Sequence, residues 1–104
     1  MADERRLSLG LALQELLGND HVYYQPPESL KIKYDCIVYN LVGGNTIYSD
    51  DVPYNFRRRY EITYITKQPD SELVDKLAIS LPMIKFDRHF VTDNLRHYVY
   101  TIYW

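Results

Sequence analysis

The sequence predicts an α+β fold in which an antiparallel four-stranded sheet carries two helices on one face. Residues 4–17 and 70–81 repeat leucine at the three- and four-residue spacings of an amphipathic helix. Four other segments alternate apolar with polar residues, or concentrate tyrosine and β-branched residues, as strands do. The predicted order is α-β-β-α-β-β, without repeats or low-complexity tracts, and this order favours helices gathered on one face of an antiparallel sheet.

The first helix is predicted over residues 4–17. Four leucines share one face of this helix: Leu9, Leu13, Leu16 and Leu17. Gly18 follows immediately and supplies the left-handed residue on which helices commonly end. Gly10 inside the helix costs about 1 kcal/mol relative to alanine, so its presence indicates that another part of the chain packs closely there.

The middle of the sequence predicts two strands joined by a long connection. After a connector that contains Pro26-Pro27, the first strand is predicted over residues 30–41. Its inward side chains are expected to be Leu30, Ile32, Tyr34, Cys36 and Val38. The second strand is predicted over residues 57–67, with Tyr60, Ile62 and Tyr64 inward. Residues 42–57 between them are interpreted as a long hairpin arm, a place where contacts with partners tend to lie.

The last part of the sequence predicts a helix and a closing hairpin. Asp70 or Ser71 can cap the helix, which must end by Pro82. Two strands, residues 83–91 and 95–104, then flank a polar turn. Because the sequence ends on Tyr-Thr-Ile-Tyr-Trp, whereas free chain ends are usually polar and frayed, this end is expected to be docked. It can be docked as a paired strand, as a surface that meets another subunit, or as both.

The composition is that of an ordinary globular domain. The 104 residues fit a single domain, residues 1–104, with 46% hydrophobic and 25% charged residues. A net charge of −2 argues against an autonomous nucleic-acid binder, and no apolar run approaches the roughly 20 residues that span a bilayer. One cysteine, and a start that lacks the apolar core of a secretory signal, predict an intracellular folding compartment. Tyrosine is abundant, with 11 copies, and it suits half-buried sheet faces and protein interfaces.

The sequence predicts neither a catalytic centre nor a cofactor or metal site. His89 and His97 lie on the two strands of the last hairpin, but two histidines without a committed third ligand match no metal-site spacing. Cys36, on a predicted apolar face, is interpreted as a small buried hydrophobe rather than a nucleophile. Gly43-Gly44 lacks the spacing and the following helix of a phosphate-binding loop.

The densest basic cluster is Arg57-Arg58-Arg59. In a strand, Arg57 and Arg59 share one side and Arg58 takes the other. Two interpretations remain open for this cluster. It can pair with Asp50 and Asp51 across the connection, or it can make an ionic contact with a neighbouring chain, where arginine is enriched.

Several runs of residues carry a resemblance to a known family. These runs are His21-Val22-Tyr23-Tyr24-Gln25-Pro26-Pro27, residues 31–39, Arg59-Tyr60-Glu61-Ile62-Thr63, Pro69-Asp70-Ser71, Phe86-Asp87-Arg88-His89-Phe90 and Asp93-Asn94-Leu95. Together they resemble the small neck and tail-completion proteins of long-tailed bacteriophages, particularly the tail terminators. The similarity extends over residues 20–97.

The resemblance implies a structural role without catalysis or a cofactor. Tail terminators assemble as a ring, usually of six copies, on the head-proximal end of the tail tube, where the ring stops tube growth and joins the tail to the neck. The implied partners are further copies of the chain, the tail tube protein and neck or connector proteins, with the tail sheath as another candidate. The implied location is the tail–neck junction of a virion assembled in the host cytoplasm. Neither membrane binding nor sequence-specific nucleic-acid binding is implied.

Two alternatives to a tail terminator stay open. One is another neck component, such as a head-closure or connector-adaptor protein. The other is a small binding module or enzyme that uses the tyrosine-rich face.

The expected interface residues come from this sequence itself and not from the resemblance. They lie in the arm, the basic cluster and the C-terminal end: Tyr48, Asp50, Asp51, Tyr54, Arg57, Arg58, Arg59, Tyr100, Tyr103 and Trp104. A head-to-tail ring uses two different patches on every subunit. An arm that reaches a neighbour would account for the long connection.

Overall fold

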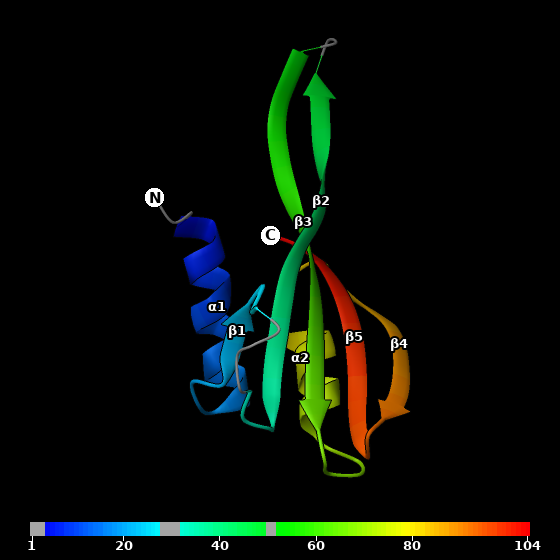
Figure 1. Ribbon diagram of the computed structural model, residues 1–104. Helices are drawn as coiled ribbons and strands as arrows, with labels where there is room; N and C mark the ends of the chain where they lie inside the picture. Colours follow the sequence, from blue (N-terminus) through cyan, green and yellow to red (C-terminus); the bar gives the residue numbers. More distant parts are fainter. Residues whose placement is uncertain (1–3, 28–31, 50–51) are drawn as a thin grey trace.

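A computed structural model of the protein describes residues 4–27, 32–49 and 52–104. It shows two helices and a five-stranded mixed sheet (Figure 1). The elements are α1 (Glu4–Leu17), β1 (Val22–Tyr24), β2 (Cys36–Ser49), β3 (Val52–Thr66), α2 (Leu73–Ser80), β4 (Ile84–Thr92) and β5 (Leu95–Tyr103). The strand order is β1-β2-β3-β5-β4, with β1 and β2 parallel and the other neighbours antiparallel.

The predicted four-stranded antiparallel sheet in the order α-β-β-α-β-β is therefore wrong, because an additional strand, β1, pairs in parallel with β2. Residues 22–24 of the predicted connector lie beside residues 37–39. Gln25 then adopts a φ of 42°, and the chain leaves the sheet before Pro26. Three residues are too few for alternation to reveal a strand, and the prolines that follow favoured an extended connector.

Helix α1 covers the residues predicted for it and ends as predicted. Gly18 has a φ of 86°, and its N–H donates to the carbonyl of Gln14 at 2.9 Å. The close packing predicted at Gly10 is also confirmed, because a Cβ atom there would lie 2.8 Å from the Tyr39 hydroxyl. Glycine is thus required by the ring that packs beneath the helix.

The hydrophobic core lies between the two helices and one face of the sheet. Its buried members are Leu9, Leu13, Ile37, Tyr39, Tyr60, Ile62, Tyr64, Leu77, Tyr100 and Ile102. The inward set predicted for the second of the long strands, Tyr60, Ile62 and Tyr64, is confirmed. Because α1 and α2 both contribute to this one cluster, they cover the same face of the sheet.

The strand predicted over residues 30–41 turns the opposite set of side chains to the core. Regular pairing with β3 begins at Cys36, after the predicted inward residues Ile32 and Tyr34, while Leu30 lies outside the described residues. Ile37 and Tyr39, rather than Cys36 and Val38, then lie in the core cluster. Both alternating sets are apolar here, so the alternation carried no information about which set faces the helices.

Helix α2 begins later than predicted, at Leu73. The Ser71 hydroxyl accepts the Leu73 N–H at 3.3 Å and shares a hydrogen bond of 2.9 Å with the Tyr64 hydroxyl. This serine therefore ties the start of the helix to the core face of β3. The helix ends at Ser80, before Pro82, as predicted.

Strands β4 and β5 form the predicted closing hairpin. The two turn residues, Asp93 and Asn94, have φ values of 54° and 62°, as a type I′ turn requires. Strand β5 lies between β3 and β4, and Tyr100 and Ile102 are fully buried, so the prediction that this end is docked as a paired strand is confirmed. Strand β4 is the outer strand, and nearly all of its residues are exposed.

Two buried tyrosines predict opposite effects of the same substitution. The Tyr100 hydroxyl donates to the Val74 carbonyl at 2.8 Å, whereas the buried Tyr60 hydroxyl has no partner among the described residues. We expect Tyr100→Phe to lower the free energy of unfolding by about 1–2 kcal/mol, because it leaves a carbonyl unpaired. Tyr60→Phe removes an unpaired buried hydroxyl and should raise that free energy by about 1 kcal/mol. Urea denaturation of both variants measures the two signs, and equal signs would contradict this account.

Candidate assembly surfaces

The most prominent surface feature is a long hairpin, residues 43–58, which we call the arm (Figure 1). It is formed by the distal halves of β2 and β3, which pair in antiparallel with register shifts between Leu41 and Gly43 and between Ile47 and Tyr48. The arm extends beyond the body of the sheet and gives the molecule its longest dimension, 50 Å. The predicted long connection is thus a paired hairpin, and β3 begins several residues earlier than predicted.

Two glycines form the neck of the arm. A Cβ atom on Gly43 would lie 2.9 Å from the guanidinium of Arg59, and one on Gly44 would collide with the ring of Phe56. Arg59 also donates to the carbonyl of Val42 at 3.4 Å. The glycines therefore let a guanidinium and an aromatic ring lie directly against the backbone where the arm leaves the sheet.

The predicted interface residues of the arm are distributed along it. Tyr48 belongs to β2 and Tyr54 to β3. Asp50 and Asp51 lie outside the described residues, so their pairing with the arginine cluster stays a prediction.

The three arginines of the basic cluster lie at the root of the arm. Register places Arg57 opposite Asn45 and Arg59 opposite Gly43, so these two arginines share one side of β3, as predicted. Arg57 is exposed, whereas Arg58 and Arg59 are half-buried. Arg57 is thus the member of the cluster most accessible to another chain.

The predicted interface residues near the end of the chain make contacts mainly within the subunit. Tyr100 is fully buried in the core and so is withdrawn from any partner. The Trp104 indole N–H donates to the carbonyl of Arg5 at 2.7 Å, and its backbone N–H donates to the carbonyl of Arg58 at 2.9 Å. Tyr103 is half-buried and remains on the surface.

The start of α1 is held by further contacts with the sheet. Arg5 donates to the carbonyl of Phe56 at 3.3 Å, which links the helix to the arm. The Arg6 guanidinium lies 4.3 Å from the ring centroid of Tyr24, and the Arg6 carbonyl accepts the Tyr39 hydroxyl at 3.5 Å. These contacts, with that of Trp104, join α1, the root of the arm and the end of β5.

Exposed apolar side chains occur on α1 and β4, and our sequence analysis did not single them out. On α1, Leu7 is 47% and Leu11 is 63% exposed. On β4, Phe86, Phe90 and Val91 are 42%, 40% and 55% exposed. The signal for the leucines was available, because they lie four residues apart on a face other than the core stripe. Strand β4 gave no such signal, since its composition matches that of buried strands.

The sheet face opposite the helices carries a polar depression of about 390 Å³. Its polar lining residues are Arg59, Glu61, Lys85, Asp87, Thr101 and Tyr103. The Thr101 hydroxyl donates to the Asp87 carboxylate. Two basic and two acidic side chains balance here, so the depression favours neither an anion nor a cation.

The structure separates the residues that a metal centre would need. His89 stacks on Tyr98 at 4.6 Å, and His97 stacks on Phe90 at 4.7 Å between ring centroids. Because His97 pairs with Phe90 and His89 pairs with Tyr98, the two histidines lie on opposite faces of the hairpin. Within the described ranges, no three His, Cys, Asp or Glu side chains are grouped so that they could hold a metal ion.

Cys36 is fully buried, as the sequence predicted. Burial, and after it the charge of Asp35, raises the pKa of the thiol to about 12. The thiol therefore stays protonated near neutral pH, where a thiolate would be needed for nucleophilic attack.

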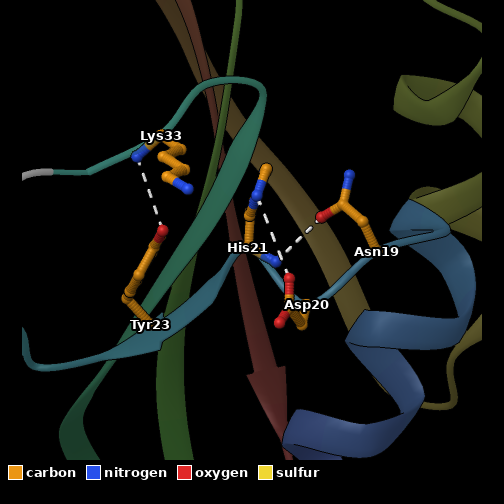
Figure 2. Close-up of polar contacts among 5 residues, drawn as sticks. All are labelled: Asn19, Asp20, His21, Tyr23 and Lys33. Carbon is orange, nitrogen blue, oxygen red and sulfur yellow. Dashed lines mark hydrogen bonds and ion pairs between the residues drawn. The ribbon is translucent and has the colours of Figure 1, made fainter.

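A set of polar contacts fixes β1 between α1 and β2 (Figure 2). The His21 N–H donates to the side-chain oxygen of Asn19 at 2.8 Å, and the Lys33 N–H donates to the Tyr23 hydroxyl at 3.4 Å. The His21 ring nitrogen Nε2 lies 3.9 Å from the Asp20 carboxylate. Most of these contacts involve backbone groups, so they position β1 beside β2.

No family model and no curated protein matches this chain. None of the helices in the described part of the chain is both long and apolar enough to cross a membrane. Function must therefore be inferred from the geometry of the surfaces and from the residue runs in the sequence.

Proposed function

We propose that the protein is a structural subunit of a bacteriophage tail, which forms a ring at the head-proximal end of the tail tube, stops tube growth and joins the tail to the neck. The arm is the observation that carries this proposal. An isolated two-stranded hairpin is marginally stable in water, and this one extends away from the core of its own subunit. Packing against a neighbouring subunit would stabilise it.

The root of the arm supports a repeated contact of this kind. Arg59 lies across Gly43 at the neck, and Arg5 of α1 donates to the carbonyl of Phe56. These contacts fix the direction in which the arm leaves the sheet. A fixed direction is what identical contacts between successive copies require.

The charge distribution fits the same proposal. The net charge is −2, and the depression on the open sheet face has charges of both signs. A ring through which DNA passes should not hold phosphates, because each neutralised phosphate adds affinity. The residue runs that resemble tail terminators support this particular role among structural proteins.

Mixing the purified protein with tail tube protein tests the proposal. We expect a hexameric ring by native mass spectrometry, and tubes that are shorter and capped at one end by electron microscopy. A matched variant replaces residues 47–55 by Asn-Gly, which keeps the pairing of Thr46 with Phe56. This variant should stay folded but neither form rings nor cap tubes. A wild-type protein that is strictly monomeric and never joins tubes would refute the proposal.

The alternative neck role, a head-closure or connector-adaptor protein, predicts different particles when the protein is absent. Loss of a terminator leaves overlong or unjoined tails. Loss of a closure protein leaves heads that leak DNA while the tails keep their normal length. Electron microscopy of particles made without the protein distinguishes the two.

A further inference from the structure

We propose that the outer face of α1 in one subunit packs against β4 of the next copy, so that the ring contact joins two different patches. This inference rests on the proposed ring and names the surfaces that form it. The α1 patch consists of Glu4, Leu7, Ser8, Leu11, Ala12 and Glu15. The β4 patch consists of Lys85, Phe86, Arg88, Phe90 and Val91.

The α1 patch is a second apolar stripe on a helix that already contributes Leu9 and Leu13 to the core. A surface helix of a monomer ordinarily turns a polar face to water. Here Leu7 and Leu11 are exposed one turn apart and line a shallow groove, with a glutamate near each end of the helix. An apolar stripe rimmed by charge is typical of a protein contact.

The β4 patch lies on a sheet edge. Among the described strands β4 pairs with β5 alone, so its outer edge presents unpaired backbone groups. Its exposed apolar side chains are Phe86, Phe90 and Val91. A helix that covers such an edge shields both the backbone groups and these side chains. Within the subunit, α1 already contacts the opposite edge strand, β1.

Charge favours the pairing of unlike patches. The α1 patch is acidic, through Glu4 and Glu15, whereas the β4 patch is basic, through Lys85 and Arg88. An antiparallel contact between two copies of α1 would bring Glu4 of one copy towards Glu15 of the other. Pairing two β4 edges around Arg88 would likewise oppose two guanidinium groups. Contact between α1 and β4 places each charge near its opposite.

The positions of the patches fit a ring. Helix α1 lies on the side of the molecule where β1 ends the sheet, and β4 ends it on the other side (Figure 1). A contact between opposite sides repeats from copy to copy and closes into a ring when the rotation per copy allows it. The arm leaves from the end of the sheet and stays available for its own contact.

Charge reversal tests this pairing directly. We expect E4K/E15K and K85E/R88E each to weaken self-association by about tenfold or more in sedimentation velocity, because each variant carries like charges on its two patches. An equimolar mixture of the two variants should regain rings with equal numbers of both, since each patch then meets its opposite charge. A mixture that stays dissociated, or that forms dimers only, would overturn the proposal.

An apolar substitution tests the contact without changing charge. Leu11→Gln removes an exposed leucine of the α1 patch and should weaken self-association by about tenfold, with an unchanged melting temperature. Ile79→Gln is the matched control, because Ile79 is 82% exposed on α2 and lies outside both patches. Equal association of the two variants would overturn the proposal, even if a charge-reversed variant failed to fold.

These experiments separate the two proposals. If the wild-type protein forms rings that cap tubes, and neither charge reversal nor Leu11→Gln changes association, the tail role stands and the α1–β4 contact is overturned. If the wild-type protein is monomeric at every concentration and leaves tubes uncapped, the tail role itself fails.

Discussion

Deletion of residues 100–104 is expected to unfold the protein. Tyr100 and Ile102 are fully buried in β5, a strand that pairs with β3 on one side and β4 on the other. Burying one such side chain contributes about 1.5–3 kcal/mol, and the deletion also removes pairing with both neighbours. The total loss is comparable with the roughly 5–15 kcal/mol by which domains are stable. Circular dichroism should show no cooperative melting transition.

A smaller change at the same end serves as the control. Trp104→Phe keeps an aromatic ring but removes the indole N–H that donates to the Arg5 carbonyl. We expect a cooperative transition, with the free energy of unfolding lower by about 1 kcal/mol. A truncated protein that melts at the wild-type temperature would mean that β5 does not have the central role described here.

Gly10→Ala is expected to destabilise the protein, although alanine favours helices by about 1 kcal/mol over glycine. The added methyl group would lie 2.8 Å from the Tyr39 hydroxyl, closer than packed atoms allow. Overpacking of this kind costs about 1–3 kcal/mol, because the ring beneath α1 is confined by its neighbours. The net effect should be a loss of roughly 1–2 kcal/mol in urea denaturation.

Tyr39→Phe should relieve this clash, because the next atom of the ring, Cζ, would lie 3.7 Å from the added methyl group. In the Tyr39→Phe background, Gly10→Ala is therefore expected to be neutral or stabilising. The double-mutant cycle isolates the contact between the two positions. If alanine is equally destabilising in both backgrounds, the hydroxyl is not what requires glycine.

The sequence was sufficient for elements whose signals are local. The leucine spacing and Gly18 determine α1, and residues 92–94 determine the closing turn. The tyrosine alternation in β3 identified its core face, because the intervening residues are polar. Strand β1 and the core face of β2 depend instead on packing between distant segments. A three-residue strand, and a strand that is apolar on both faces, leave no periodic signal to interpret.

The candidate surfaces were predictable to a similar degree. Residues 42–57 were rightly interpreted as an arm, because their length exceeds that of an ordinary connection. Tyr100 was expected at an interface and lies in the core, since an aromatic residue in a strand is equally suited to both places. Leu7 and Leu11 were overlooked because the core stripe of α1 already accounted for its leucines.

Arg5 has a mechanical consequence for the proposed assembly. Its guanidinium joins the first turn of α1 to the carbonyl of Phe56, and its own carbonyl accepts the Trp104 indole. A lateral neighbour that tilts α1 would therefore pull on the base of the hairpin and change its inclination. Adding one subunit to the ring would then set the reach of that lever towards the next, so that closure proceeds cooperatively.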